Sequence, residues 1–469
     1  MFINGEWRSS PTTRIVSDPA TGERVDDVAL ASTRDCLDAV GAAHDAFPAW
    51  RATSPRIRGE ILRRAFEIMT AEASEIAELI VRENGKVLAD AKAEATYAAE
   101  FFRWFSEEAV RIDGALTRAP GGTNWIAVTR QPVGVAVLIT PWNFPAAMLT
   151  RKIGPALAAG CSVVVKPAAE TPLTALHIAD VLHRAGVPAG VVNVVVADPP
   201  GEAVAAMLAD DRVRKLSFTG STNVGRQLLT QAAARVVNCS MELGGNAPFV
   251  VLADADVDAA ISGAMLAKMR NGGAACTAAN RFLVARPVAA EFTDKLAERM
   301  SSLVVGHGLD PSSQVGALVS RAQQERINGL IDRSIAGGAR VVARGSAPKG
   351  SGAFVAPIVL DGVEAESELF NTEVFGPVAP ITTFDDEADA LRLANAVEHG
   401  LVAYVYTKDV ARGMRFAQGI ETGMVGLNRG LVSDPAAPFG GFKQSGLGRE
   451  GAHDGLLAFC ETQYVAVEW

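Results

Sequence analysis

The sequence has few cysteines, few aromatic residues and no long apolar segment. Its five cysteines, at positions 36, 161, 239, 276 and 460, form no CxxC motif and have no neighbouring histidine. This argues against a disulfide framework and a zinc site, because both need clustered ligands. No apolar run approaches about 18 residues, so no membrane-spanning helix is expected. Residues 1–7 lack the basic and apolar regions of a signal peptide, and we expect a soluble, cytoplasmic protein.

The charge pattern excludes other classes. The net charge of −9 comes from interspersed acidic and basic residues, without a basic block. The sequence therefore lacks the cluster of basic residues that is typical of nucleic-acid-binding proteins. The six histidines are scattered, and no metal site is expected. The composition, 49% apolar and 6% aromatic, is typical of an α/β enzyme. A chain of 469 residues is too long for one core, so two or three domains are expected.

The hydrophobic pattern predicts a parallel sheet. Ser54-Pro55 opens a long amphipathic helix for which Gly85 is a C-terminal cap, and a second helix follows over 90–112. Short β-branched runs then alternate with helices such as 172–185 and 222–233, which predicts a parallel sheet covered on both faces. The predicted strands of this sheet cover residues 133–140, 161–166, 191–196, 213–218 and 236–241.

The pattern is renewed after Gly244, which indicates a second α/β domain. It contains predicted strands over 249–252 and 282–284 and a helix over 256–268. Two strand-like segments, 123–129 and 462–467, fit neither domain. Because lone strands must pair with something, we interpret them as an arm sheet that extends toward a neighbouring subunit.

Cys276 and Glu242 indicate covalent chemistry in two stages. Cys276 is flanked by small residues, and Glu242 enters a Gly-Gly turn. The thiolate can attack a carbonyl carbon, and the carboxylate can later activate water to release the product. Taken alone, each has a plainer interpretation, since a single cysteine is most often a small buried hydrophobe and such a glutamate is usually a turn residue.

Three strand ends carry further candidates. Gly220-Ser221 opens a predicted helix whose free N–H groups suit a diphosphate, although its GxxxxG spacing to Gly225 is not the usual GxGxxG. Lys166 ends a valine-rich strand, where it can meet ribose hydroxyls or a phosphate. Asn143, in a loop fixed by two prolines and beside Trp142, can donate to an oxyanion. An ordinary turn or a solvated lysine remains the alternative for each.

One more turn joins an acid and an aromatic ring. Glu373 and Phe375 are close enough in sequence to hold a ribose and flank a flat ring. By itself this is a weak signal.

These motifs together resemble the NAD(P)-dependent aldehyde dehydrogenase superfamily, in order and interval, over essentially the whole chain. The shared motifs are Trp142-Asn143, Lys166, Phe218 to Thr222, Glu242-Leu243-Gly244-Gly245-Asn246, Cys276, Glu373 to Pro377 and Pro438-Phe439-Gly440-Gly441. The resemblance implies that Cys276 is the nucleophile, that Glu242 activates the hydrolytic water, and that Asn143 with the Cys276 main-chain N–H forms the oxyanion hole.

The resemblance also implies the cofactor contacts and the domains. The implied contacts are Trp142, Asn143, Lys166, Ala169, Gly220, Ser221, Gly225, Leu243, Glu373 and Phe375. We expect an aldehyde dehydrogenase fold of three parts. Residues 1–112 and 131–243 form a Rossmann-like cofactor domain, 244–440 a catalytic domain, and 113–130 and 455–469 a small β oligomerisation arm of a homodimer or homotetramer.

Two arginines indicate a substrate with a distal carboxylate. Arg151 lies eight residues after Asn143, Arg270 lies six before Cys276, and Ser433 precedes the Pro438 motif. Guanidinium groups match carboxylates in a bidentate geometry. These positions resemble the succinate-semialdehyde dehydrogenase branch, so succinate semialdehyde is the expected substrate. Glutarate semialdehyde or a sulfonate-bearing aldehyde would use the same clamp, and surface salt bridges are the plainer interpretation of both arginines.

The chain departs from the family pattern at two places. The glutamine common before the nucleophile is missing, and Ala278 removes the second cysteine of some relatives, so a local disulfide switch is not available. Where strongly NAD-selective relatives have an acid, this chain has Ala169, followed by Glu170. Without a carboxylate to repel a 2′-phosphate, we expect NADP or NAD, with NADP slightly favoured.

Other functions stay open at this point. A broad-specificity aliphatic or aromatic aldehyde dehydrogenase would have an apolar mouth without converging arginines. A CoA-acylating enzyme of the same superfamily would lack the hydrolytic glutamate, which makes Glu242 an argument against it. A binding protein built on an inactive enzyme fold is disfavoured because Cys276, Glu242, Asn143 and Lys166 are all present.

Overall fold

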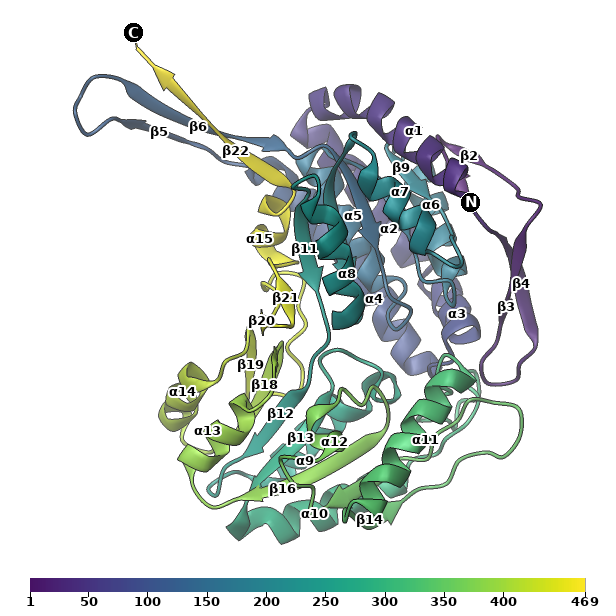
Figure 1. Cartoon of the computed structure of the whole chain (residues 1–469), viewed down its shortest axis with the longest axis vertical. Helices are drawn as coiled ribbons and strands as arrows, with labels where there is room; N and C mark the ends of the chain where they lie inside the picture. Colours follow the sequence, from purple (N-terminus) through teal and green to yellow (C-terminus); the bar gives the residue numbers. More distant parts are fainter. Residues whose placement is uncertain (469) are drawn as a thin grey trace.

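The computed structural model describes residues 1–468 and shows two α/β lobes and a projecting arm (Figure 1). The first lobe surrounds an eight-stranded sheet, and the second surrounds a seven-stranded sheet. A three-stranded sheet forms the arm, which carries the C-terminal end of the chain. This is the α/β architecture expected from the sequence.

The first sheet has a parallel centre with antiparallel edges. Its central strands β9, β8, β7, β10 and β11 are parallel, as the sequence predicts. The edge strands β1, β2 and β21 are antiparallel and were not predicted. In sheet order the strands are β2 (Glu6–Trp7), β1 (Phe2–Ile3), β9 (Val192–Val194), β8 (Ser162–Lys166), β7 (Val135–Ile139), β10 (Val213–Thr219), β11 (Asn238–Glu242) and β21 (Gly446–Leu447).

Helices cover both faces of this sheet, which explains its continuous apolar strands. One face packs against α2 (Pro55–Ala71), α3 (Ala73–Asn84), α4 (Leu88–Glu108), α5 (Ala147–Ala159) and α6 (Pro172–Arg184). The other packs against α1 (Thr33–Ala52), α7 (Gly201–Ala209) and α8 (Thr222–Ala233).

The prediction of one long helix from Ser54 to Gly85 was wrong. The helix breaks at Glu72. Its main-chain N–H donates the last hydrogen bond of α2, to Ile68 O, and its non-helical ψ of 11° separates α2 from α3. Its two predicted ends are confirmed. Ser54 accepts the N–H of Ile57 at the start of α2, and Gly85, with φ of 92°, ends α3. The helix predicted over 90–112 is α4, continued by a 3-10 turn at Ala109–Arg111.

The second sheet is mostly parallel and is also covered on both faces. In sheet order its strands are β14 (Arg340–Arg344), β15 (Ile358–Asp361), β16 (Val378–Phe384), β13 (Ala279–Ala285), β12 (Ala247–Val251), β18 (Val402–Tyr406) and β19 (Met424–Leu427). The helices on its faces are α9 (Val257–Met269), α10 (Arg286–Ser301), α11 (Arg321–Ala336), α12 (Glu368–Asn371), α13 (Glu387–Asn395) and α14 (Val410–Gly419).

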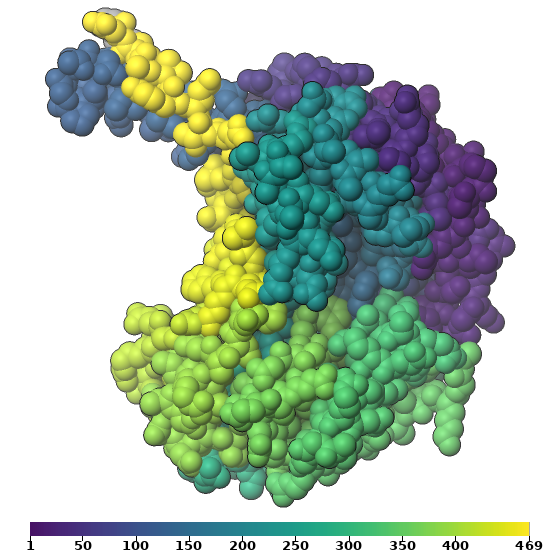
Figure 2. Space-filling model, viewed as in Figure 1, coloured from purple at the N-terminus to yellow at the C-terminus, as the bar shows by residue number. Residues whose placement is uncertain are grey.

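The two segments without a place in either lobe pair with each other. In the arm, β22 (Cys460–Val467) pairs antiparallel with β6 (Trp125–Pro132), which pairs with β5 (Ala115–Arg118). Leu116, Tyr464 and Val465 are exposed on these strands, and the arm stands clear of the body in Figure 2. Trp469, the last residue of the segment predicted as an arm, lies outside the described residues.

Short strands link the two lobes. β20 (Phe442–Lys443) pairs with β17 (His399–Gly400), and β21 continues to the first sheet, before α15 (Ala452–Leu457). A separate hairpin joins β3 (Thr13–Ser17) and β4 (Arg24–Ala29). Within residues 1–468, none of the helices combines the length and apolarity needed to cross a bilayer.

The topology brings the loops of both lobes to one crevice. Register aligns Ile139 with Lys166, and Thr219 with Glu242, so four carboxyl ends meet at one edge of the first sheet. The chain order reverses between β7 and β10, and such a switch point is where open α/β sheets bind ligands. The second lobe contributes the loops that precede β12, β13 and β16, at the amino ends of parallel strands.

Candidate active site

Two adjoining cavities form one cleft, and the cavity that holds Cys276 is lined by residues of both lobes. A cavity of about 500 Å³ extends from Lys166 along the start of α8. A second cavity, of about 450 Å³, is lined by Cys276, Glu242 and Asn143. Both are also lined by Pro141, Trp142, Thr219, Gly220 and Ser221, so the cleft is continuous from Lys166 to the thiol.

A strained loop delivers Cys276 to this cleft. Asn271, Gly272 and Gly273 all have left-handed backbone conformations, with φ of 53°, 57° and 81°. At Gly273 a Cβ would lie 2.3 Å from the main-chain oxygen of Gly376, so only glycine fits. The thiol that follows is half-buried. Burial raises the pKa of Cys276 to about 12, although the charge of Arg151 opposes the shift.

Glu242 ends β11 with an unsatisfied carboxyl oxygen. The residue is buried, and its Oε2 atom has no hydrogen-bond partner. Burial, and then the neighbouring charge of Glu450, raise the pKa of Glu242 well above 4.5. Behind it, Lys152 Nζ lies 2.5 Å from Glu450 Oε1. A carboxyl whose pKa is raised toward the working pH is suited to general-base catalysis.

The amide of Asn143 lies in the same cavity as the thiol. Asn143 is buried, and its Nδ2 donates to Ala274 O at 3.1 Å, two residues before Cys276. The oxyanion loop, defined here as residues 142–147, and the nucleophile loop, defined as residues 270–276, are therefore in direct contact. An amide donor beside the sulfur can stabilise an alkoxide that forms there.

The Lys166 end of the cleft has the features of a dinucleotide site. Burial lowers the pKa of Lys166, against the opposing charges of Glu170 and Asp198, and Ala169 lies on the same wall. Gly220 is required, because a Cβ there would lie 2.5 Å from the Phe218 ring. Ser221 caps the 12-residue helix α8, whose N-terminus favours an anion.

One buried hydroxyl in this cleft still needs a partner. Thr219 Oγ1 is buried without a hydrogen bond, and Thr219 lines both cavities. A polar ligand along the cleft would satisfy it. The residues present therefore fit a nicotinamide dinucleotide that extends from Lys166 toward Cys276.

The Glu373 turn closes the other side of the cleft. Glu373 Oε1 accepts the Gly245 N–H at 3.1 Å, and burial raises its pKa to about 7. Phe375 has a left-handed φ of 58° and meets the Trp142 ring edge to face, with 5.2 Å between centroids. Leu243 also lines this cavity. Gly225 lies outside the lining; a Cβ there would meet Leu243 Cδ2 at 2.4 Å.

The predicted substrate arginines differ in burial. Arg151 is only 2% exposed, lies 4.1 Å from the Phe439 ring centroid, and donates to the Tyr97 hydroxyl at 2.7 Å. Its Nε has no partner. Arg270 is half-buried, 5.2 Å from the Phe144 ring centroid, and donates to Thr277 Oγ1 at 3.3 Å.

Both guanidinium groups lie near the sulfur. Both lower the pKa of Cys276, so both act on the thiol electrostatically. Ser433 is half-buried in the loop that follows β19. The charges of Arg151 and Arg270 thus act on Cys276 from two elements that are far apart in sequence, although none of Arg151, Arg270 and Ser433 lines the cavity that holds Cys276.

Several lining residues were not predicted. Gln323, Arg326 and Met148 line the cavity of Cys276. Arg326 donates to Val374 O at 2.5 Å and so supports the Glu373 turn. Gln323 and Arg326 share one face of α11, but their spacing alone does not reveal which face of that helix meets the cleft.

The comparisons with known proteins agree with this site. A model of the aldehyde dehydrogenase family matches residues 7–465, so the chain belongs to the aldehyde dehydrogenase family and is an NAD(P)-dependent oxidoreductase. Among its relatives is the succinate-semialdehyde dehydrogenase of Paenarthrobacter nicotinovorans, 51% identical over 94% of this chain and 98% of that protein. The glutarate-semialdehyde dehydrogenase of Pseudomonas putida strain KT2440 is 44% identical over 99% of this chain and 97% of that protein.

A solved structure supports the fold. The succinate-semialdehyde dehydrogenase of Burkholderia pseudomallei superimposes with a TM-score of 0.97 at 45% identity, covering 99% of this chain and 97% of that one. The aldehyde dehydrogenase fold predicted from the sequence is therefore confirmed.

Proposed function

We propose that this enzyme oxidises succinate semialdehyde to succinate with NADP or NAD. This proposal rests on one observation. Cys276, Glu242 and Asn143 line one cavity, and two guanidinium groups lie near the Cys276 sulfur. An aldehyde bound at Cys276 can direct a distal carboxylate toward Arg270 and Arg151, since guanidinium groups pair with carboxylates. The names of the relatives from P. nicotinovorans and B. pseudomallei support this choice.

Glutarate semialdehyde is the second candidate. The P. putida relative carries that name at 44% identity over nearly the whole chain. The two substrates differ by one methylene, which hydrophobic contacts discriminate by only about 1–3 kcal/mol.

The chemistry follows from the placement of the side chains. The Cys276 thiolate adds to the aldehyde carbon, and the resulting alkoxide accepts hydrogen bonds from the Asn143 amide and the Cys276 main-chain N–H. One such donor is worth roughly 3–4 kcal/mol. The nicotinamide nucleotide, when bound, supplies the acceptor for the hydride of that carbon. Glu242 then takes a proton from the water that hydrolyses the thioester on Cys276. The acid product leaves with the thiolate regenerated, and Glu242 returns its proton to solvent.

Each part of the cleft has a proposed binding role. Lys166 and Glu373 hold ribose hydroxyls, while Gly220 and Ser221 hold the diphosphate at the start of α8. Trp142, Ala169, Leu243 and Phe375 complete the walls, and Gly225 shapes them through Leu243. Arg151, Arg270 and Ser433 bind the substrate carboxylate.

The parts of the chain have proposed roles as well. Residues 1–112 and 131–243 bind the cofactor, residues 244–440 carry the catalytic loop, and residues 113–130 and 455–469 join subunits of a homo-oligomer. The exposed side chains of Leu116, Tyr464 and Val465 support the last role, because apolar groups on a projecting sheet favour burial by a partner. We also propose a cytoplasmic location.

Initial rates test the substrate. Succinate semialdehyde, glutarate semialdehyde, butanal and benzaldehyde are compared with NAD and with NADP. We expect kcat/KM for the carboxylate-bearing aldehydes to exceed that for butanal about 100- to 10,000-fold, the value of two charge-assisted hydrogen bonds. Equal rates with butanal or benzaldehyde would establish a broad-specificity enzyme instead.

Two variants test the chemistry. Cys276→Ala is expected to abolish oxidation. Glu242→Gln is expected to give one burst of reduced nucleotide equal to the enzyme concentration and then to stall. A normal steady-state rate in either variant contradicts the assignment.

A further inference from the structure

A buried ion pair lies directly beneath the oxyanion loop. Lys86 follows the Gly85 cap that ends α3, and Glu94 lies in the second turn of α4. Both side chains are fully buried, and Lys86 Nζ lies 2.5 Å from Glu94 Oε2. Neither residue lines the cavity that holds Cys276.

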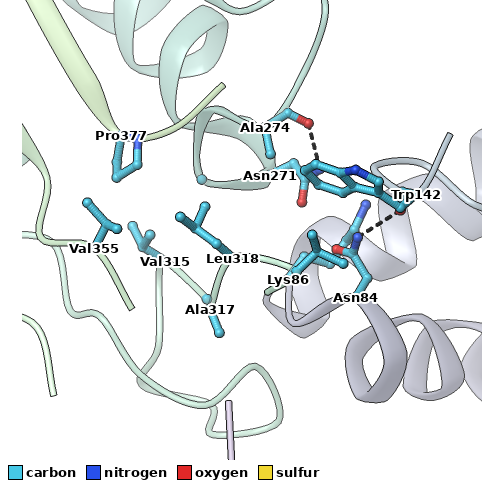
Figure 3. Close-up of a pocket in the computed structure, with 13 residues that line it drawn as sticks. Asn84, Lys86, Trp142, Asn271, Ala274, Val315, Ala317, Leu318, Val355 and Pro377 are labelled. Atoms are coloured by element: carbon cyan, nitrogen blue, oxygen red, sulfur yellow. Dashed lines mark hydrogen bonds between the residues drawn. The ribbon is translucent and has the colours of Figure 1, made fainter. Parts of the chain in front are cut away.

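The ammonium of Lys86 also holds the main chain of the proposed oxyanion donor. Lys86 Nζ donates to Asn143 O at 2.7 Å and lies 4.2 Å from the centroid of the Phe144 ring. Asn271 Nδ2 donates to the same oxygen at 2.8 Å. Figure 3 shows Lys86 and Asn84 below Trp142, with Asn271 and Ala274 of the nucleophile loop on the other side. Two donors, from two elements, therefore fix the carbonyl of Asn143.

The carboxylate of Glu94 holds the other end of the same loop. Its Oε1 accepts the N–H groups of Ala146 and Ala147, at 2.9 and 3.3 Å, where α5 begins. Asn84 Nδ2 donates to Trp142 O at 2.9 Å. The segment from Asn84 to Glu94 thus contacts the oxyanion loop before, at and after Asn143.

The same segment also contacts the nucleophile loop. Asp90 Oδ2 accepts the N–H of Asn271 at 2.8 Å, and Asn271 Nδ2 donates to Ala274 O at 2.9 Å (Figure 3). Asn143 Nδ2 donates to that same oxygen of Ala274. One short segment, from Asn84 to Glu94, therefore fixes the donor loop relative to the sulfur-bearing loop.

Stability alone does not account for this arrangement. Burying two opposite charges costs several kcal/mol per ion before their attraction is counted, and well-packed apolar side chains often stabilise such a site better. The Lys86–Glu94 pair does supply polar atoms in fixed positions next to the oxyanion loop. A displacement of about 1 Å in such a loop can lower the reaction rate about 100-fold.

We propose that Lys86 and Glu94 are positioning residues for catalysis, which hold the Asn143 amide in register with the Cys276 sulfur. This inference rests on the proposed function, because it presupposes that Asn143 donates to the alkoxide formed on Cys276.

Lys86→Met is the first test. The methionine keeps the bulk and removes the hydrogen bond to Asn143 O. We expect kcat to fall about 10- to 100-fold, while KM for succinate semialdehyde and the nucleotide Kd change by no more than about twofold. Lys86→Gln is expected to recover part of the loss, because a side-chain amide, although one bond shorter than lysine, can still donate toward the same carbonyl.

A second buried lysine provides the matched control. Lys215 is equally buried and donates to Asn238 and Ser240, at the opposite end of β10 from the cleft. Lys215→Met is expected to retain kcat, and the unfolding temperature is measured for both variants. If both variants lose kcat in proportion to lost stability, the positioning role is wrong.

A readout without nucleotide isolates the oxyanion site. Succinate semialdehyde is expected to protect the Cys276 thiol against iodoacetamide by forming the thiohemiacetal, whose stability depends on the oxyanion donors. Lys86→Met is expected to raise the aldehyde concentration needed for half-protection about tenfold, and unchanged protection overturns the inference.

A double mutant separates this inference from the proposed function. Asn143→Ala alone is expected to lower kcat by roughly 100- to 1,000-fold, and adding Lys86→Met is expected to cost nothing more, since the donor is already absent. If Asn143→Ala keeps its rate, the proposed oxyanion role fails. If Asn143→Ala loses rate but Lys86→Met does not, only the positioning role fails. The same holds if the two losses multiply in the double mutant. If Lys86→Met does not fold, Lys86→Gln and Glu94→Gln are tested in its place. Parental kcat in both of these variants overturns the inference.

Discussion

The main-chain oxygen of Cys276 lies against the α-carbon of Gly245, so closely that a Cβ at residue 245 would lie 2.3 Å from that oxygen. Glycine at this position lets the turn after Glu242 approach the nucleophile loop. The segment that follows Glu242 is therefore brought against Cys276 by main-chain contact.

Gly245→Ala is expected to push the nucleophile loop away from the turn and to lower kcat by about 100-fold, because a shift of about 1 Å disturbs attack geometry. Steady-state kinetics measure the effect. Gly121→Ala is the control, since a Cβ at Gly121 meets nothing within 4 Å. Parental activity in Gly245→Ala would mean that the loop relaxes without displacing the sulfur.

The Cys276 thiol is expected to react slowly in the nucleotide-free enzyme. Its pKa of about 12 is raised by burial, so the thiolate is a small fraction at neutral pH and grows about tenfold for each pH unit. The rate of inactivation by iodoacetamide should therefore rise about tenfold per unit between about pH 7 and 9. A plateau in that range would show a much lower thiol pKa.

The charge of Arg151 contributes to this reactivity. Because that guanidinium lowers the pKa of Cys276, Arg151→Met is expected to raise the pKa further and to slow alkylation at every pH in the range. Faster alkylation in this variant would contradict the electrostatic effect. The comparison uses the nucleotide-free enzyme, so it does not depend on turnover.

Much of the fold follows from the sequence, because short apolar runs that alternate with helices predict a parallel sheet covered on both faces. The candidate residues were found through their positions at strand ends and turns. Lys86 and Glu94 could not be found in this way. Their partners are main-chain atoms of a loop about 50 residues away, and no side-chain pattern encodes such contacts. The break at Glu72 was also hidden, since the apolar spacing continues through it.

A buried carboxyl outside the cleft should make stability depend on pH. Glu83 accepts the N–H groups of Leu173 and Thr174, and burial raises its pKa from 4.5 to about 7. The folded state therefore binds a proton that the unfolded state has lost between these pH values, and stability falls as pH rises through that window. The full effect is roughly 3 kcal/mol.

Glu83→Gln is expected to remove this dependence, so that the variant gains stability relative to the parent as pH rises from about 5 to about 8. Thermal unfolding across that range measures the difference. Glu78→Gln, an exposed position on the same helix, is the control and should keep the parental pH profile. Parallel profiles for Glu83→Gln and the parent would show that Glu83 titrates at its ordinary pKa.

Arg270 should discriminate between charged and uncharged aldehydes. Its guanidinium is half-buried and close enough to Cys276 to lower the thiol pKa. Arg270→Met is expected to lower kcat/KM for succinate semialdehyde about 10- to 100-fold, the value of a hydrogen bond to a charged group. Butanal, which lacks the carboxylate, should lose no more than about threefold. Equal losses with both aldehydes would assign Arg270 to the support of the nucleophile loop.

The choice of nucleotide is expected to depend on Ala169. This residue lines the cleft beside Lys166, where a carboxylate would repel a 2′-phosphate and leave a 2′-hydroxyl unaffected. Ala169→Glu should weaken NADP binding about tenfold and NAD binding by no more than about twofold, because two like charges within a few ångströms cost about 1 kcal/mol or more. Fluorescence titration with each nucleotide measures both affinities. Ala169→Gln matches the glutamate in size without its charge, so a loss of NADP affinity in both variants would show that steric fit, and not repulsion, governs the preference.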